Sequence, residues 1–150
     1  VDIFYDPPLS RGRPGPISGP DLMDPNRTLS LDGFSEKVVV INVWGQWCGP
    51  CRTEMPELQR VYDATRDEGV AFLGIDQKID PEDAAVDMIE QTGVTYDLGR
   101  DDGSSMIEWF GIPGLPTTIF VHADGTIADV HTGPLDEAEL RQILDEKLGA

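Results

Sequence analysis

The feature that most constrains this chain of 150 residues is a pair of cysteines placed directly after a run of β-branched side chains. The run, Val38–Trp44, is apolar at nearly every position, which is typical of a strand buried on both faces of a sheet. Cys48 and Cys51 follow within a few residues and are the only cysteines in the chain. A lone Cys-x-x-Cys pair between a strand and a helix indicates a redox site.

The position of the pair predicts different reactivities for the two sulfurs. We expect Cys48 at the N-cap of the helix, with Gly49 allowing a tight turn and Pro50 in the first turn, where a missing N–H costs nothing. The unpaired amides and the positive end of the helix dipole then favour the Cys48 thiolate. Cys51 lies one turn further on, with its α-carbon roughly 5–6 Å away and its sulfur more buried. Cys48 is therefore predicted to form a mixed disulfide and Cys51 to resolve it.

Three other uses of the cysteine pair are open at this point. A structural disulfide normally joins distant segments, because closing so short a loop removes little entropy from the unfolded chain. A zinc site needs two more ligands, and only His122 and His131 offer nitrogens, at no known zinc spacing. Two thiolates and a histidine suit Cu(I), which makes a copper carrier the strongest of the three. Thiol–disulfide exchange is favoured over all of them, with no metal and no cofactor beyond a redox-active Cys48–Cys51 disulfide.

The beginning of the chain differs in composition from the rest. Six of the twelve prolines fall in the first 25 residues, together with three glycines. A segment of this kind cannot donate a regular ladder of hydrogen bonds. We predict an extended arm over residues 1–26, which is either a tether or a strap packed on the surface, and one globular domain over residues 27–150.

Hydrophobic periodicity predicts alternating strands and helices in the domain. Continuous apolar runs predict strands, and apolar residues at helical spacing predict helices. A turn is expected at Asp32-Gly33 after a short strand, and a hairpin turn at Asp124-Gly125. The strands are expected at residues 28–31, 38–44, 70–75, 116–121 and 127–130, and the helices after the N-cap Cys48, from Asp80, over 103–110 and over 135–148. This order predicts an α/β domain with a mixed sheet.

The charge of the chain excludes several kinds of partner. Lys and Arg total 11 and Asp and Glu total 28, which gives a formal net charge of −17. A protein this acidic lacks the cations needed to bind nucleic acid or to dock on anionic lipid. No apolar run approaches the ~20 residues of a membrane helix, so no membrane span is expected. The chain begins at Val1 rather than Met, which is compatible with a leader or a membrane anchor removed before this numbering starts.

The wider sequence resembles the TlpA/ResA-like branch of the thioredoxin superfamily. Trp47–Cys51 reads Trp-Cys-Gly-Pro-Cys, and residues 52–58 continue Arg-Thr-Glu-Met-Pro-Glu-Leu. About 65 residues after Cys51, Gly114–Val121 reads Gly-Leu-Pro-Thr-Thr-Ile-Phe-Val, with an Asp-Gly pair after it. The similarity runs from residue 28 to the C-terminus. It implies a thioredoxin fold, a central mixed sheet flanked by helices, here with an added N-terminal hairpin and an extended arm.

The same resemblance implies an extracytoplasmic bacterial protein-disulfide oxidoreductase. Such proteins usually keep the cysteines of client proteins reduced, notably those of apocytochrome c before haem attachment. The sequence has no nucleotide-binding fingerprint, so we expect a membrane thiol reductase or oxidase as the electron partner. A disulfide-forming oxidase of the same fold is the alternative within this class, and a Cu(I)-binding chaperone is the alternative outside it. Peroxidase chemistry is disfavoured, because neither cysteine lies in the Thr-x-x-Cys context of peroxiredoxins.

The resemblance also implies roles for residues around the cysteines. Pro116 matches the family's cis-proline, whose loop faces the cysteine pair. A cis bond there leaves the backbone of Leu115 free to pair with an extended client segment. Trp47 is expected on the rim of the site, where it contacts clients together with Gly49 and Pro50.

Two positions depart from the patterns of related proteins. Cytosolic thioredoxins usually carry a buried aspartate six residues before the first cysteine, whereas this chain has Asn42, which cannot relay a proton. Asp80 is the best match to an acidic residue that some TlpA/ResA-like proteins use after the next strand, so it is the candidate acid/base, with simple capping of a helix as the alternative. The dipeptide Gly49-Pro50 is that of thioredoxin, and it favours a potential nearer thioredoxin's ~ −270 mV than the ~ −120 mV of a strong oxidant.

Overall fold

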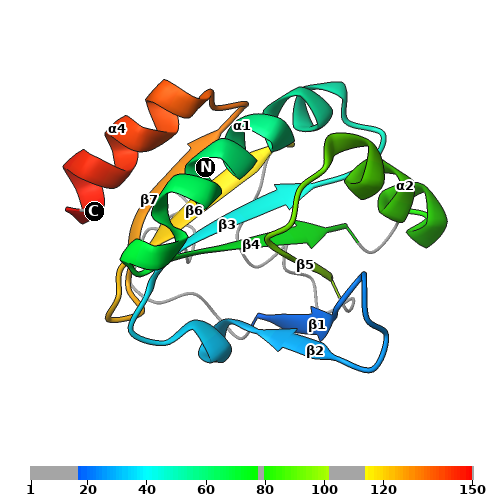
Figure 1. Ribbon diagram of the computed structural model, residues 1–150, viewed down its shortest axis with the longest axis horizontal. Helices are drawn as coiled ribbons and strands as arrows, with labels where there is room; N and C mark the ends of the chain where they lie inside the picture. Colours follow the sequence, from blue (N-terminus) through cyan, green and yellow to red (C-terminus); the bar gives the residue numbers. More distant parts are fainter. Residues whose placement is uncertain (1–16, 78–79, 102–113, 150) are drawn as a thin grey trace, which may run out of the picture.

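The computed structural model describes residues 17–77, 80–101 and 114–149, which form one sheet with helices on it and a small hairpin beside it (Figure 1). The strands are β1 (Ser18–Pro20), β2 (Thr28–Ser30), β3 (Val38–Trp44), β4 (Val70–Asp76), β5 (Asp97–Arg100), β6 (Thr117–Val121) and β7 (Ile127–Thr132). The helices are α1 (Gly49–Thr65), α2 (Glu82–Thr92) and α4 (Glu137–Leu148), with short 3-10 turns η2 (Leu31–Phe34) and η3 (Arg66–Glu68).

The main sheet has the strand order β5-β4-β3-β6-β7, with β3 at its centre. β3 pairs in parallel with β4 and antiparallel with β6, so the sheet is mixed, as the order of predicted elements indicates. The β-branched run of β3 is buried along almost its whole length, which fits a strand with neighbours on both edges and cover on both faces. The end of β3 at Trp44 is therefore fixed from every side, and the cysteine pair begins four residues later.

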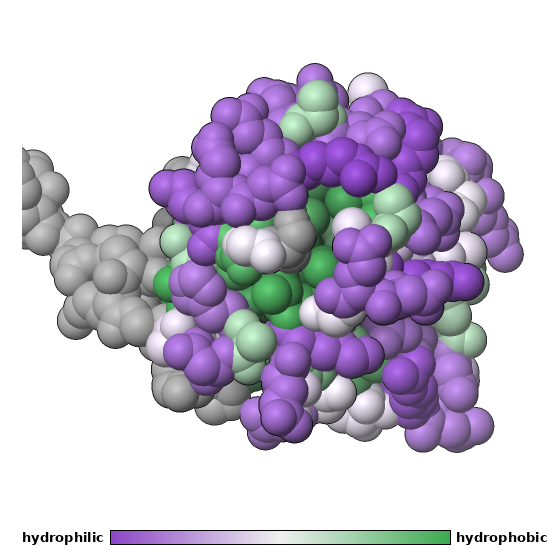
Figure 2. Space-filling model, turned by 60° about the vertical axis from the view of Figure 1, so that its left-hand side comes forward, coloured by the Kyte–Doolittle hydropathy of each residue, from purple (hydrophilic) through white to green (hydrophobic). Residues whose placement is uncertain are grey.

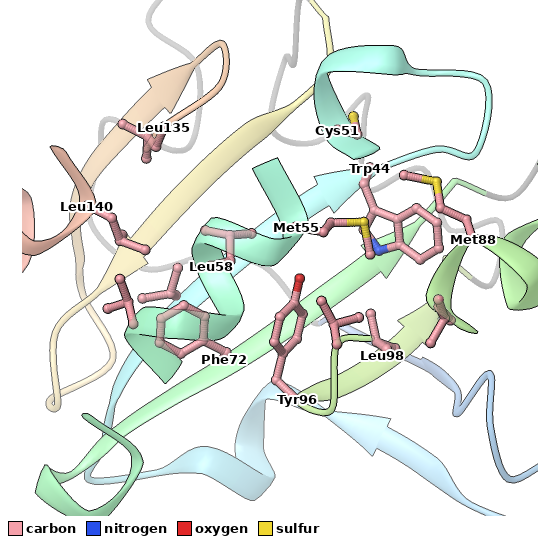
Figure 3. Close-up of a cluster of buried hydrophobic side chains, with 14 of the residues drawn as sticks. Trp44, Cys51, Met55, Leu58, Phe72, Met88, Tyr96, Leu98, Leu135 and Leu140 are labelled. Atoms are coloured by element: carbon pink, nitrogen blue, oxygen red, sulfur yellow. The ribbon is translucent and has the colours of Figure 1, made fainter. Parts of the chain in front are cut away.

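Alternating side chains of the strands divide the core into two apolar layers. One layer lies between the sheet and the helices α1, α2 and α4, which Figure 1 shows above the sheet. Figure 3 shows part of this layer, with Cys51, Trp44 and Met55 at one end and Leu140 towards the other. The second layer lies on the opposite face, where Ile17 and Leu29 of the hairpin segment pack against the apolar side chains of β3, β4 and β6.

The proline-rich arm is partly a strap. From Ile17 onward it packs against the domain, and β1 pairs antiparallel with β2 to form the added hairpin. The backbone N–H of Leu22 donates to the carbonyl of Leu98 at 2.9 Å, which attaches the hairpin to the edge of the main sheet. Packed structure therefore begins before the boundary predicted at residue 26. The predicted turn at Asp32-Gly33 is wrong, because these residues lie in η2 and the hairpin joins β2 to the preceding strand instead.

Strand β5 is absent from the predicted elements. Its sequence, Asp-Leu-Gly-Arg, has neither alternating nor continuous apolar character, so no local signal marks it. It forms because β4 offers a parallel edge and because the β1–β2 hairpin covers its other side, where Leu29 lies against Gly99. The helix predicted over 103–110 falls outside the described residues.

The surface of the molecule carries most of its charge. On the face shown in Figure 2, hydrophilic residues cover most of the surface and surround a hollow in which apolar residues are visible. None of the described helices is both long and apolar enough to span a bilayer. Five acidic residues within the described ranges are buried rather than exposed at this charged surface: Asp21, Glu54, Asp76, Asp80 and Asp101.

Helix α4 begins with a capping box, a local sequence motif whose contribution to stability can be measured. Asp136 is the N-cap, its side chain accepts from the backbone N–H of Glu139, and the Glu139 carboxylate accepts from the backbone N–H of Asp136. We expect Asp136→Ala to lower the free energy of unfolding by about 1 kcal/mol, because one of these backbone donors loses its partner. Urea titration measures the change. Asp136→Ser, which keeps the cap, should recover most of it, and equal loss in both variants would contradict the role of the cap.

Candidate active site

The two cysteines form a disulfide at the start of α1. The Cys48 and Cys51 α-carbons are 5.3 Å apart, within the predicted range. A tight turn leads into the pair, in which the backbone N–H of Cys48 donates to the carbonyl of Gly45 at 3.1 Å. Both cysteines are buried, with Cys48 3% exposed and Cys51 0% exposed.

The helix terminus acts on one sulfur only. Cys48 is the N-cap of α1 and Pro50 lies in the first turn, as the sequence predicts. The backbone N–H of Cys51 points at the Cys48 sulfur, at 3.2 Å. In the reduced protein this donor and the positive end of the helix dipole favour the thiolate of Cys48. The site is thus able to hold one ionised and one protonated sulfur.

The loop before β6 lies beside the cysteines. The Leu115–Pro116 peptide bond is cis, as the resemblance implies. Thr117, the next residue, pairs with Val43 near the end of β3, which places this loop next to the turn that leads to Cys48. Pro116 is buried, and its carbonyl accepts from the backbone N–H of Gly133 at 2.9 Å.

Trp47 stands at the surface of the site, whereas Trp44 is fully buried. The Trp47 side chain is 58% exposed, and its indole N–H donates to the Gln77 side chain at 3.1 Å. A β-carbon added at Gly45 would lie 2.8 Å from the indole nitrogen of Trp47, so a side chain at this position would displace the ring. Gly49 and Pro50 are also exposed, so three of the five predicted client-contacting residues are accessible, with Leu115 half-buried beside Pro116.

A buried carboxyl group lies on the same face of α1 as Cys51. Glu54 is 1% exposed and accepts from the Asn42 side-chain amide at 2.9 Å and from the backbone N–H of Leu135 at 2.7 Å. Burial raises the pKa of Glu54 to about 7, against the opposing effect of these two hydrogen bonds. A carboxyl group with this pKa can take up or release a proton near neutral pH, one helical turn from the buried sulfur.

Sequence reasoning missed Glu54, although the sequence contains a signal for it. Cys51, Met55, Leu58 and Val61 follow the apolar stripe of α1, and Glu54 falls inside that stripe rather than on the polar face. A single acid within an apolar stripe must be buried and therefore neutral or hydrogen-bonded. Asn42, which cannot relay a proton, serves instead as a hydrogen-bond donor to this acid.

Asp80 also lies at the site, but it does not cap a helix. The N-cap of α2 is Pro81, and the helix begins at Glu82. The Asp80 side chain is 1% exposed, and it accepts from the backbone N–H of Gln46, in the turn before Cys48, at 2.8 Å. The helix-cap alternative for Asp80 is therefore wrong, and the carboxylate faces the loop that carries the cysteines.

The histidines do not join the cysteines in a metal site. Within residues 17–77, 80–101 and 114–149, no group of three or more His, Cys, Asp and Glu side chains is arranged to hold an ion. His122 follows β6, and His131 lies in β7 opposite Thr118, both only partly buried. The arrangement of donors gives no support to the alternative of a Cu(I) carrier.

Comparison with known proteins gives a consistent result. Residues 18–130 match the model of the AhpC/TSA family. The chain is 39% identical over 127 residues to the thiol:disulfide interchange protein DsbE of Allochromatium vinosum, covering 83% of this chain and 67% of that protein. It is 30% identical over 118 residues to the thiol-disulfide oxidoreductase ResA of Halalkalibacterium halodurans, covering 79% and 66%. The chain thus spans about two thirds of the length of these curated relatives.

Solved structures agree with the fold. A secreted thiol-disulfide isomerase from Corynebacterium glutamicum superposes with a TM-score of 0.80 at 30% identity, covering 98% of this chain and 89% of that one. A thioredoxin-family thiol:disulfide interchange protein from Chlorobium tepidum also superposes with a TM-score of 0.80, at 25% identity, covering 93% and 98%. The five-stranded sheet, the flanking helices and the added hairpin therefore belong to a known architecture.

The raised pKa of Glu54 predicts a pH-dependent stability. Because the folded protein binds this proton more tightly than the unfolded chain, the stabilisation is complete below pH 4.5 and is lost as the pH rises through about 7. Glu54→Gln cannot titrate, and its amide fits if Asn42 turns its own amide over. We therefore expect the free energy of unfolding of the variant, relative to wild type, to rise by about 3 kcal/mol between pH 4.5 and 8.

Urea titrations of the oxidised protein at several pH values measure this difference. Glu90→Gln, which removes an exposed acid on α2, is the matched control and should show no such trend. A constant difference between Glu54→Gln and wild type across this range would contradict the raised pKa.

Proposed function

The chain belongs to the AhpC/TSA family, as a TlpA/ResA-like thiol-disulfide oxidoreductase of the thioredoxin superfamily, and from this premise we propose that it reduces disulfides of client proteins outside the cytoplasm. The observation that carries the proposal is the asymmetry of the pair: Cys48 caps a helix and accepts the Cys51 N–H, while the Cys51 sulfur is fully buried. One sulfur is built to react with a partner and the other to finish the exchange.

The exchange proceeds in two steps that balance sulfur and electrons. In the reduced protein the Cys48 thiolate attacks one sulfur of a client disulfide, which forms a mixed disulfide and releases the other client sulfur as a thiolate. Cys51 then gives up its proton and attacks the Cys48 sulfur, which releases the client as a dithiol and leaves the Cys48–Cys51 disulfide. Two electrons pass to the client, and an external dithiol must restore them. We propose a membrane thiol reductase as that donor.

Glu54 is suited to receive the proton of Cys51 in the second step. It lies on the same face of α1, three residues further along, and its pKa of about 7 makes it a base of suitable strength near neutral pH. Asp80 is the second buried acid at the site, and its contact with Gln46 is to the loop rather than to a sulfur.

Clients are expected to dock across the exposed side of the pair. Trp47, Gly49 and Pro50 provide an accessible rim, and Leu115 lies in the loop next to it. Within the part of the chain that the structure describes, no hydrogen bond engages the backbone of Leu115, which suits pairing with an extended client segment. The resemblance suggests apocytochrome c as one such client, and a site outside the cytoplasm as the place of the reaction.

Cysteine variants test the two assigned roles. We expect Cys48→Ser to reduce exchange with a disulfide-containing client to the rate in buffer alone, because the thiolate that the helix terminus stabilises is removed and Cys51 is fully buried. Cys51→Ser should instead accumulate a covalent adduct with the client, because the mixed disulfide cannot be resolved. Non-reducing electrophoresis and mass spectrometry detect the adduct. Equal loss of activity in both variants without any adduct would mean that the roles are wrongly assigned.

The direction of electron flow is tested by the reduction potential. A reductant with Gly-Pro between its cysteines is expected near thioredoxin's ~ −270 mV, whereas a value above about −180 mV would identify a disulfide-forming oxidase. Equilibration of the protein with glutathione buffers, followed by alkylation of free thiols, measures the potential. This experiment separates the proposed function from the alternative of the same fold.

A further inference from the structure

Next to the cysteine pair lies a second buried pair, of carboxyl groups, that the exchange reaction itself does not use. Asp76 is the last residue of β4 and Asp80 precedes α2, and neither side chain is more than 1% exposed. Asp76 is in register with Trp44 of β3 on one side and with Arg100 of β5 on the other. Asp80 is close enough to Asp76 to raise the pKa of the Asp76 carboxyl group, after burial the largest cause of that shift.

A proton shared by the two groups supplies this pair with a hydrogen bond that two carboxylates cannot make. Two carboxylates are acceptors alone, and three of their four oxygens then have no hydrogen-bond donor within the described residues. With one proton between them, Asp76 and Asp80 form a hydrogen bond and the pair carries a single negative charge. Two like charges at this depth are unfavourable, which is why carboxyl pairs of this kind ionise in two separate steps.

Burial and the partner carboxyl group favour retention of that proton near neutral pH, and the neighbouring cation opposes it. Arg100 is the cation that faces it, with a guanidinium nitrogen 3.8 Å from Asp76 and a donor contact to the backbone carbonyl of Asp80. The next residue, Asp101, donates its backbone N–H to the backbone carbonyl of Asp76 at 2.9 Å. Glu82, the acid at the start of α2, is exposed to solvent. Burial first and Asp80 second raise the pKa of Asp76 to about 9, and Arg100 only partly opposes them.

This carboxyl pair is connected to the turn before Cys48. The free oxygen of Asp80 accepts from the Gln46 backbone N–H at 2.8 Å, and Gln46 lies inside the turn closed by Cys48 and Gly45. Gln77, which follows Asp76, makes two more hydrogen bonds to this part of the chain. Its backbone N–H donates to the Trp44 carbonyl, and its side-chain oxygen accepts from the Trp47 indole N–H. Asp80 thus holds this turn by a side-chain hydrogen bond to its backbone.

We propose that Asp76 and Asp80 share one proton and act as positioning residues for thiol–disulfide exchange, holding the turn before Cys48 through the Gln46 amide until that proton is lost. The inference rests on the proposed function and adds a pH limit to it. Loss of the proton to solvent leaves two carboxylates that repel each other, which disturbs the bond to Gln46 and places a further negative charge near the Cys48 thiolate. Both effects slow exchange at alkaline pH.

The bond to Gln46 is tested without any client. In ¹H–¹⁵N spectra of the oxidised protein between pH 5 and 10, the Gln46 amide resonance should titrate in wild type with a midpoint near 9. Asp76→Asn replaces the protonated carboxyl by an amide donor, so the resonance should keep its low-pH position and stop titrating. Asp80→Ala should move it at every pH, because the acceptor is gone. Glu82→Gln, which removes an exposed acid from the same segment, should leave it unchanged.

The effect on exchange is tested with the reduced protein and a neutral small disulfide, 2-hydroxyethyl disulfide. In wild type we expect the second-order rate constant to rise as Cys48 ionises and to fall above about pH 9, which gives a bell-shaped profile. Asp76→Asn should rise to a plateau without the fall. Asp80→Ala should be about tenfold slower at pH 7, since a hydrogen bond to a charged acceptor is lost. Asp80→Asn, which keeps an oxygen at this position, should recover most of that rate.

The outcomes separate this inference from the proposed function. An equal alkaline fall in Asp76→Asn and wild type, or a Gln46 amide unaffected by Asp80→Ala, would overturn the positioning role. If instead the protein exchanges with 2-hydroxyethyl disulfide in the expected pH pattern but leaves client disulfides intact, the proposed function fails and this inference stands. A rate for Asp80→Asn as low as that of Asp80→Ala would also count against the hydrogen bond as the cause.

Discussion

The hydrogen bond from the Cys51 amide to the Cys48 sulfur is the interaction on which this site depends. It exists because α1 begins at Gly49, directly after a turn that the buried strand β3 fixes in space. Without that turn the helix terminus would have no sulfur to stabilise, and the two cysteines would not differ in ionisation. The central strand, the turn and the first turn of α1 therefore form one unit, and the rest of the fold holds it in place.

The buried acids around this unit contrast with the acidic surface. The chain has a formal net charge of −17, and most of its described acids are solvated at the surface, whereas Glu54, Asp76 and Asp80 are enclosed by the protein. Burial raises the pKa of Glu54 and of Asp76, so both groups can hold protons at pH values at which exposed acids are ionised. The second step of the proposed exchange removes a proton from Cys51, and buried acids with raised pKa values near the cysteines are suited to that chemistry.

Much of this fold could be predicted from local patterns, and the exceptions have one physical cause. Strand β3, helix α1 and strand β6 carry clear apolar periods; the sequence predicts both strands to within a residue and the start of α1 after its N-cap. Strand β5 and hairpin strand β1 have no such period and form because a neighbouring strand offers a free edge. The burial of Glu54 was open to prediction from the apolar stripe of α1, but its partner Leu135 is 81 residues away along the chain.

The sequence by itself determined the chemistry of the cysteine pair, because an N-cap cysteine, a following glycine and proline, and a second cysteine one turn on are all local relations. It also determined the buried strand before them. Only the tertiary structure decided which acids serve the site. Glu54 lies on α1, Asp76 ends β4 and Asp80 lies in the loop before α2, and their burial arises only where these separate parts of the chain pack together.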